Sequence, residues 1–393
     1  MDKKTKTREE KNKQLVVDEI AANPSRFTFD ALRDYVENAF KKYLNTTEAG
    51  TEEERRKEQQ RKEVLRQSIG CCYAGTVKER QFVKQFIHRL LTGQANVFMP
   101  EYRDGCVNIT VENYKYIFPW DNPYRLPTQV KFLGILYNRQ DTEGAGTFDY
   151  LVKKYKLNRL RDINVMQGDS KQAKGMYINE RDIDAIFEGE KVVFDYNLAM
   201  EVLVQLIYEE YKGNGCIDEL LYQNIDDVGI GLSGLQSDVE PMHLRGKAVK
   251  KAYDGVWIKH KGLLIHLTFL SFHSFANLRR VVNQLVAYDM QGSFSEKEGF
   301  KMGYGKDGSR RTSVITPFAE NPAAWVRKFT ASSLTNRQLI TNNGALYIKG
   351  VDDLINVEKA LVQGGATIPI CGPQGVGKTT CLEAISEYIQ NWY

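Results

Sequence analysis

The sequence has little that would place the protein in a membrane or outside the cell. Its longest apolar stretch, residues 262–272, is interrupted by His266, Thr268 and Ser271. It is much shorter than the ~20 residues that a membrane-spanning helix needs. The first residues are polar and lack the apolar core of a signal peptide. We therefore expect a cytoplasmic protein with no transmembrane segment, whose membrane contact is peripheral or made through a partner.

Cysteine pairs, histidine clusters and net charge are scarce as well. The six cysteines form no CxxC pair and have no histidine at zinc-ligand spacing, so we expect reduced thiols. The five histidines are scattered, and neither G-x-S-x-G nor H-E-x-x-H occurs. The formal net charge is +4, from 54 Lys+Arg and 50 Asp+Glu. Dedicated nucleic-acid binders are far more basic, so stable nucleic-acid binding is not expected.

The chain is long enough for two or three globular domains. It has 393 residues, of which 42% are hydrophobic and 26% charged. Residues 1–70 read as a charged helical extension, and residues 71–194 are an N-terminal region without recognisable chemistry. Acidic residues precede basic ones by four positions between Glu52 and Arg66, which predicts a helix. We interpret its charged face as solvated; the alternative is a helix that docks a partner.

Regular patterns are clearest from residue 195 onward. Apolar residues at helical spacing predict helices over 79–91, 197–211 and 275–289. Two β-hairpins are predicted, one from 256–258 and 263–268, the other from 310–316 and 323–329. Residues 95–165, rich in Tyr, Pro and Asn, read as irregular or mixed structure. Residues 195–330 therefore predict an α+β domain, followed by a linker at 331–350 and a helix over 352–363.

The most informative stretch matches G-x-x-x-x-G-K-[ST] in full. With typical residue frequencies, a chain of this length matches it by chance in about 2% of cases. The preceding apolar residues 368–371 predict a short strand, and residues from Thr379 to about Gln390 predict a helix. Strand, glycine loop and helix together predict nucleotide binding. The predicted binding residues are Gly372, Pro373, Gln374, Gly375, Val376, Gly377, Lys378, Thr379 and Thr380.

Each residue type in this loop has a physical role. Gly372 and Gly377 allow backbone angles that let main-chain N–H groups surround a phosphate. Lys378 would place a positive charge on the β- and γ-phosphates of ATP. Thr379 would supply a hydroxyl ligand to Mg²⁺, and the helix N-terminus favours the same anion.

The sequence ends at Tyr393, fifteen residues after Lys378. One strand and one helix cannot bury the core of a P-loop ATPase, which also needs an acidic strand end near its Mg²⁺. We therefore expect the front part of a longer protein, which in this form does not hydrolyse ATP.

Three segments before the loop resemble the secretion ATPases of the type II/type IV superfamily, especially the CpaF-type ATPases of Tad pilus assembly. Residues 216–230 are similar to that family's "G-x-L-E-P-L-L … D-x-x-V-T-E-I-M-V" stretch. Residues 306–317 resemble "P-D-G-S-R-V-N-A-V-I-P-P", with Arg311 in place of an apolar residue and Thr316 in place of a proline. Residues 325–340 resemble "T-I-R-K-F … L-T … D-L-I". The resemblance covers residues 195–393.

The resemblance implies an α/β fold, in which an α+β domain precedes a RecA-like P-loop domain beginning in residues 351–393. It implies a homohexameric motor that uses ATP and Mg²⁺ to power pilus assembly or protein secretion, with an inner-membrane platform protein as partner. Arg310 and Arg327 match two arginines thought to approach the nucleotide phosphates, and with Lys378 they are the predicted catalytic residues. The family's acidic Mg²⁺ residues and histidine box would lie beyond Tyr393.

Two other functions stay open. The chain could be an adaptor that binds ATP without useful hydrolysis and uses its N-terminal extension as an interaction arm. It could also be a DNA-translocating ATPase of a conjugation system, in which case residues 1–195 would bind DNA in a salt-sensitive way.

Overall fold

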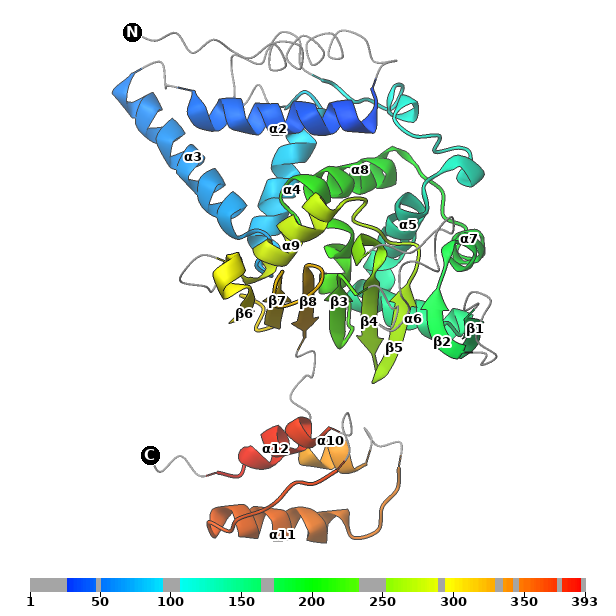
Figure 1. The fold of residues 1–393 in the computed structure, drawn as a ribbon, viewed down its shortest axis with the longest axis vertical. Coiled ribbons are helices and arrows are strands. Elements are labelled where there is room, and N and C mark those ends of the chain that lie inside the picture. Colours follow the sequence, from blue (N-terminus) through cyan, green and yellow to red (C-terminus); the bar gives the residue numbers. More distant parts are fainter. Residues whose placement is uncertain are drawn as a thin grey trace. The chain divides into compact units, whose positions relative to one another are not determined.

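A computed structural model describes residues 27–46, 51–94, 107–163, 173–232, 252–288, 294–328, 335–341, 346–372 and 377–389. The chain divides into two units, Met1–Lys328 and Phe329–Tyr393. The protein has the mixed α/β fold that the sequence predicts (Figure 1). Among the described helices, none is both long and apolar enough to cross a membrane.

The first unit contains a mixed sheet in the order β1-β2-β5-β4-β3-β8-β7-β6. Neighbouring strands run antiparallel except β2 and β5, which are parallel. The strands are β1 (Arg161–Ile163), β2 (Ala173–Ile178), β3 (Asp227–Ile230), β4 (Val256–His260), β5 (Leu263–Leu267), β6 (Phe300–Tyr304), β7 (Arg310–Val314) and β8 (Ala323–Arg327).

Helices accompany this sheet in the first unit. They are α2 (Phe29–Asn45), α3 (Glu52–Cys71), α4 (Val77–Leu91), α5 (Thr128–Glu143), α6 (Thr147–Tyr155), α7 (Glu180–Gly189), α8 (Tyr196–Tyr211) and α9 (Phe275–Ala287). Side-chain caps begin several of them. Asp195 accepts a hydrogen bond from the Leu198 amide at the start of α8, and Ser274 accepts one from the Asn277 amide at the start of α9.

Two hydrophobic clusters meet at α8. Val202 and Leu206 belong to the cluster that contains the inward side chains of the strands and of α9. Leu203 and Ile207 belong to the cluster formed with α2 and α4. Because 3.6 residues make one turn, these pairs lie on different sides of the helix. One buried helix therefore joins the N-terminal helices to the sheet.

Several predicted elements are confirmed, among them α4, α8, α9 and the antiparallel pairs β4–β5 and β7–β8. In the β4–β5 turn, Lys261 has φ 50° and Gly262 has φ 80°, as a tight hairpin turn requires. The irregular or mixed structure expected over 95–165 is wrong for α5 and α6, which occupy much of the described part of that range.

The second unit contains α10 (Asn336–Ile340), α11 (Val351–Gln363) and α12 (Lys378–Ser386), which contact one another. Helix α10 lies inside the predicted linker, and α11 confirms the helix expected over 352–363. The strand expected over 368–371 is wrong, because residues 366–372 are irregular. A strand needs a neighbour to pair its backbone N–H and C=O groups. The described part of this unit contains no strand that could serve as one.

Candidate functional site

The ends of the glycine loop are held together at the start of α12. Gly377 has φ +86°, a left-handed conformation that residues with a Cβ rarely adopt, and Lys378 is the first helical residue. The Lys378 ammonium donates a hydrogen bond of 2.8 Å to the Gly372 carbonyl. The structure thus brings Gly372, Gly377 and Lys378 together. Pro373, Gln374, Gly375 and Val376 lie outside the described residues.

The start of α12 has the features of an anion site. The amides of the first turn have no partner inside the helix, and the helix dipole places a partial positive charge there. Thr379 is exposed and Thr380 is half-buried in this turn. A phosphate at this end could accept hydrogen bonds from main-chain amides, while Lys378 would exchange its carbonyl partner for a phosphate oxygen.

Arg310 and Arg327 lie directly opposite each other on neighbouring strands. In the antiparallel register of β7 and β8, Arg310 pairs with Arg327. Residues that are directly opposite share one face of a sheet, so both arginines are on the same side. Both are exposed; the Arg327 side chain keeps 62% of its surface. The sheet therefore brings together the two arginines that the resemblance singles out.

One carboxylate and several apolar side chains share this face. Asp227 of β3 pairs in register with Arg327, and its carboxylate lies 4.0 Å from the guanidinium. Burial raises the pKa of Asp227, and the positive charge of Arg327 partly offsets this rise. The register also places Met302 on this face, and Arg310 donates to its sulfur at 3.4 Å. The exposed apolar members of the face are Phe300, Met302, Tyr304 and Trp325.

The turn before β7 explains how Arg310 reaches its place. The Asp307 carboxylate accepts hydrogen bonds from the Ser309 amide and hydroxyl, and Gly308 has φ +76°. This local bonding fixes a tight turn between β6 and β7. Arg310 is the first residue after it, and the alternation of a strand sends Arg310 and Arg311 to opposite faces.

Arg311, one of the two positions at which the sequence departs from the motif that residues 306–317 resemble, points into the protein. It is 1% exposed and donates to the Tyr73 carbonyl at 3.1 Å and to the Ser309 hydroxyl. Burial lowers its pKa, which the nearby Asp307 partly opposes. A buried guanidinium needs such partners. Arg311 therefore links β7 to the loop between α3 and α4.

A second buried polar cluster was not predicted from the sequence. Arg80 of α4 donates to Asp218 at 2.7 Å, to Glu219 at 2.5 Å and to Gln205 at 3.0 Å. Its guanidinium lies 4.2 Å from the centre of the Tyr222 ring. Burial raises the pKa of Asp218, but the Arg80 charge and several hydrogen bonds outweigh it, so that this pKa is lowered. We interpret the cluster as an anchor that holds α4 to the segment after α8.

The described residues contain no group of three or more His, Cys, Asp or Glu arranged to hold a metal ion. Neither a scan against protein-family models nor a search of curated proteins found a match for the chain.

Proposed function

We propose that the protein belongs to a cytoplasmic, ring-forming ATPase motor that powers pilus assembly or protein secretion at the cytoplasmic membrane. The observation that carries this proposal is the complete phosphate-loop sequence from Gly372 to Thr379, which runs directly into α12. Its subunits would form a homohexamer that binds ATP with Mg²⁺ and acts on an inner-membrane platform protein.

The loop would bind the triphosphate through main-chain amides. Gly377 supplies the backbone conformation, and Lys378 supplies a charge at the first helical residue. The Thr379 hydroxyl would bind Mg²⁺, which bridges the β- and γ-phosphates. This assignment uses residues whose chemistry and spacing are specific to phosphate binding.

Arg310 and Arg327 would stabilise the charge on the transferred phosphate. Two arginines directly opposite on neighbouring strands repel each other, and opposite-charge pairs would suit the sheet better. An anion shared between two guanidinium groups would remove this repulsion. Their register therefore supports a role in phosphate recognition.

The proposal is tested by binding of a fluorescent ATP analogue, which does not depend on turnover. We expect Mg²⁺-dependent binding of the ATP analogue to the 393-residue protein. Lys378→Ala should lower the affinity at least about 100-fold, because it removes a charge-assisted contact to the phosphates. Lys359→Ala, an exposed substitution on α11, is the matched control and should bind as the parent does. Binding that is equal in Lys378→Ala and the parent would refute the proposal.

A further inference from the structure

The loop between α3 and α4, residues 72–76, packs against the turn between β6 and β7. The Lys306 amide in this turn donates a hydrogen bond of 2.8 Å to the Ala74 carbonyl. The Arg311 guanidinium, just after the turn, donates to the Tyr73 carbonyl at 3.1 Å. Figure 1 shows the joined ends of α3 and α4 beside β6 and β7. Two segments that are far apart in the sequence are therefore bonded to each other directly.

Gly75 allows the loop and the turn to approach this closely. It has φ +100°, a left-handed conformation that favours glycine. A Cβ at this position would lie 2.5 Å from the Asp307 carboxyl carbon and 2.7 and 2.8 Å from its two oxygens. The Asp307 carboxylate cannot simply rotate away, because it accepts hydrogen bonds from the Ser309 amide and hydroxyl. A residue larger than glycine would therefore displace the turn or the loop.

The loop is held on its other side by α8 and the residues after it. The Tyr208 hydroxyl donates to the Cys72 carbonyl at 3.1 Å, and the Asn214 amide group donates to the Tyr73 carbonyl at 3.1 Å. Tyr208 and Asn214 are both buried. With the bond from the turn to Ala74, three consecutive carbonyls of the loop have partners from distant parts of the chain. The protein core therefore fixes the loop, and the loop fixes the turn.

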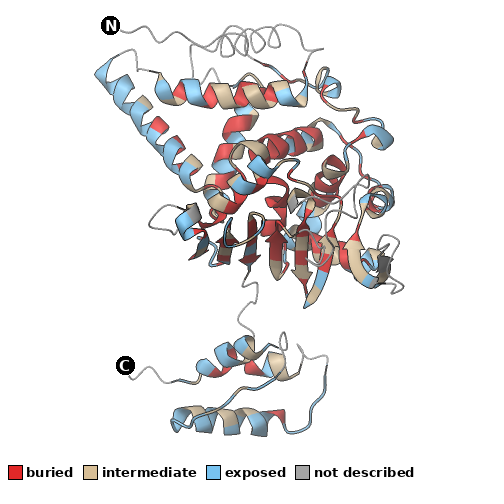
Figure 2. Cartoon of the chain, viewed as in Figure 1, coloured by how far each residue is buried: buried red, intermediate tan, exposed pale blue. Residues whose placement is uncertain are grey.

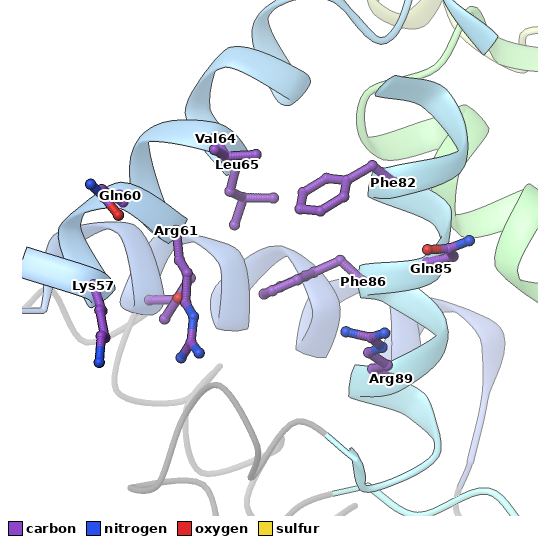
Figure 3. Close-up of a pocket in the computed structure, with 10 residues that line it drawn as sticks. Lys57, Gln60, Arg61, Val64, Leu65, Phe82, Gln85, Phe86 and Arg89 are labelled. Carbon is purple, nitrogen blue, oxygen red and sulfur yellow. The ribbon is translucent and has the colours of Figure 1, made fainter. Parts of the chain in front are cut away.

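The packing of α3 on α4 determines where the loop lies. Leu65 of α3 and Phe86 of α4 are buried in the same hydrophobic cluster. Figure 3 shows Phe82 and Phe86 pointing toward α3, with Leu65 directed toward Phe82. Most of α3 is otherwise exposed, as Figure 2 shows, so its contact with α4 is what holds it in place. The loop is therefore the end of a helical hairpin that rests on the turn before β7.

Arg310 lies between two residues that this contact holds. Ser309, directly before it, is bonded to Asp307 of the turn. Arg311, directly after it, is bonded to the Tyr73 carbonyl of the loop. Because side chains alternate along a strand, the Arg310 side chain lies on the opposite, exposed face of β7. The contact thus fixes the backbone on both sides of Arg310, and with it the direction in which the guanidinium extends.

We propose that Gly75 and Asp307 are positioning residues, which hold Arg310 where it recognises the terminal phosphate of ATP. This inference rests on the proposed function and gives the helical hairpin of α3 and α4 a part in nucleotide recognition. Hydrogen bonds from a guanidinium to a phosphate are short and directional, so a misplacement of about 1 Å weakens them strongly. A Cβ on Gly75 forces a shift of that size, because it would lie 2.5 Å from an atom that needs at least 3.4 Å for ordinary contact.

The test compares the affinities of the 393-residue protein for mant-ATP and mant-ADP in the presence of Mg²⁺. Their ratio reports recognition of the γ-phosphate, whereas a loss of folded protein lowers both affinities alike. Arg310→Ala should reduce the preference for ATP about tenfold, because a charge-assisted contact is lost. Gly75→Ala should reduce it at least about threefold. The double variant should match Arg310→Ala within about twofold, because Gly75 acts only through Arg310.

A second variant and a matched control accompany Gly75→Ala. Asp307→Ala changes an exposed residue of the turn, so it gives a folded protein even where Gly75→Ala does not. It removes the hydrogen bonds that fix the turn and should also reduce the ATP preference at least about threefold. Gly70→Ala is the control, because a Cβ at this position of α3 meets no atom within 4 Å. It should keep the parent's ratio within about twofold. Circular dichroism verifies the fold of each variant.

Three results would overturn the proposal while ATP binding still requires Lys378. The first is a folded Gly75→Ala or Asp307→Ala protein that keeps the parent's ATP preference. The second is a further loss of preference when Gly75→Ala is added to Arg310→Ala, and the third is an unchanged preference in Arg310→Ala. Each would leave the phosphate-loop assignment intact. If the parent binds neither nucleotide, or Lys378→Ala binds ATP as the parent does, the proposed function fails and the positioning role fails with it.

Discussion

At the scale of single residues, the buried ion cluster around Arg80 has the largest predicted effect on stability. Arg80 contacts the carboxylates of Asp218 and Glu219, which are buried in the same cluster. Replacing it with Met removes the guanidinium that pairs directly with both carboxylates, and breaking a buried ion pair in this way costs about 3–5 kcal/mol. We therefore expect Arg80→Met to lower the free energy of unfolding by roughly this amount, measured by urea denaturation.

The matched control is Arg55→Met, an exposed position of α3. Surface substitutions of this kind are expected to change stability by less than about 0.5 kcal/mol. A loss below about 1 kcal/mol in Arg80→Met would mean that the cluster is not an anchor, since buried pairs that lose one partner normally cost far more.

Lys84, one turn after Arg80, predicts a pH dependence. Burial lowers the pKa of its amine to about 8, and the Arg80 charge adds to this shift. The ordinary value in an unfolded chain is about 10.4. Between these values the unfolded chain binds more protons than the folded one, so this group makes stability rise with pH from about 8 to about 10.4. At pH 7 the Lys84 amine is charged in both states, so the whole free-energy cost of burying its charge lowers the stability of the folded protein.

Lys84→Met should therefore be more stable than the parent at pH 7 by about 1–3 kcal/mol. The loss of the hydrogen bond from Lys84 to Tyr137 reduces this gain. The gain should shrink when unfolding is measured at pH 10. Lys78→Met, exposed on the same helix, should show no gain at either pH. A gain for Lys84→Met that is the same at both pH values would contradict the assigned pKa.

At the scale of elements, the pairing of Arg310 with Arg327 is expected to cost stability. Like charges directly opposite on neighbouring strands are unfavourable, and threonine fits a strand well. We expect Arg310→Thr to raise the free energy of unfolding by about 0.2–1 kcal/mol in the absence of nucleotide. The measurement is thermal or urea unfolding at low salt.

Measuring stability at low and at high salt separates the loss of charge repulsion from the higher strand propensity of threonine. Screening weakens the repulsion, so the gain should decrease at high salt. Lys301→Thr on β6 serves as the comparison. Lys301 is a half-buried cation that pairs with Glu298, so its replacement should not stabilise the protein. A loss of stability in Arg310→Thr would show that the arginine serves the fold rather than an anion.

The elements also show what the sequence could predict. Helices α8 and α9 have apolar stripes at helical spacing beside a capping residue, so both were predicted close to their true bounds. Helix α5 was not, because all seven residues from Val130 to Leu136 are buried and leave no stripe. Its Gly134 looks like a breaker, yet the Phe194 ring would lie 2.5 Å from any Cβ there. Tertiary contacts that a local pattern cannot reveal decide this segment.

The candidate site, too, could be predicted only in part from the sequence. The sequence alone predicts the phosphate loop, because its spacing along the chain is the signal; of its residues, the structure describes Gly372 and Gly377–Thr380. The register that sets Arg310 opposite Arg327 depends on the pairing of β7 with β8, which residue spacing alone does not give. Arg80 and Asp218 are 138 residues apart in sequence, so nothing local links them.

At the scale of the whole molecule, the two units differ in buried apolar residues. In the described part of Phe329–Tyr393, these are Val351, Ala384 and Ile385, whereas the first unit has two large clusters. Fewer buried apolar contacts mean a lower free energy of local opening. We expect amides of α11 to exchange with deuterium at least about 100-fold faster than those of α8 in the nucleotide-free protein.

Hydrogen exchange followed by mass spectrometry gives both rates in one sample. Helix α9, which packs against the sheet, is the internal reference and should exchange as slowly as α8. Equal protection of α11 and α8 would contradict the expectation. If the ATP-binding proposal holds, MgATP should slow exchange at the start of α12 without changing α8.

The double attachment of α8 has a practical consequence for anyone who shortens this protein. Its Leu203 and Ile207 lie in the cluster formed with α2 and α4, which both contact α8. A version that starts after residue 94 would expose the Leu203 and Ile207 side chains to water, and exposed apolar surfaces of this kind promote aggregation. Expression trials should therefore retain the front helices even when the ATP-binding end is the target.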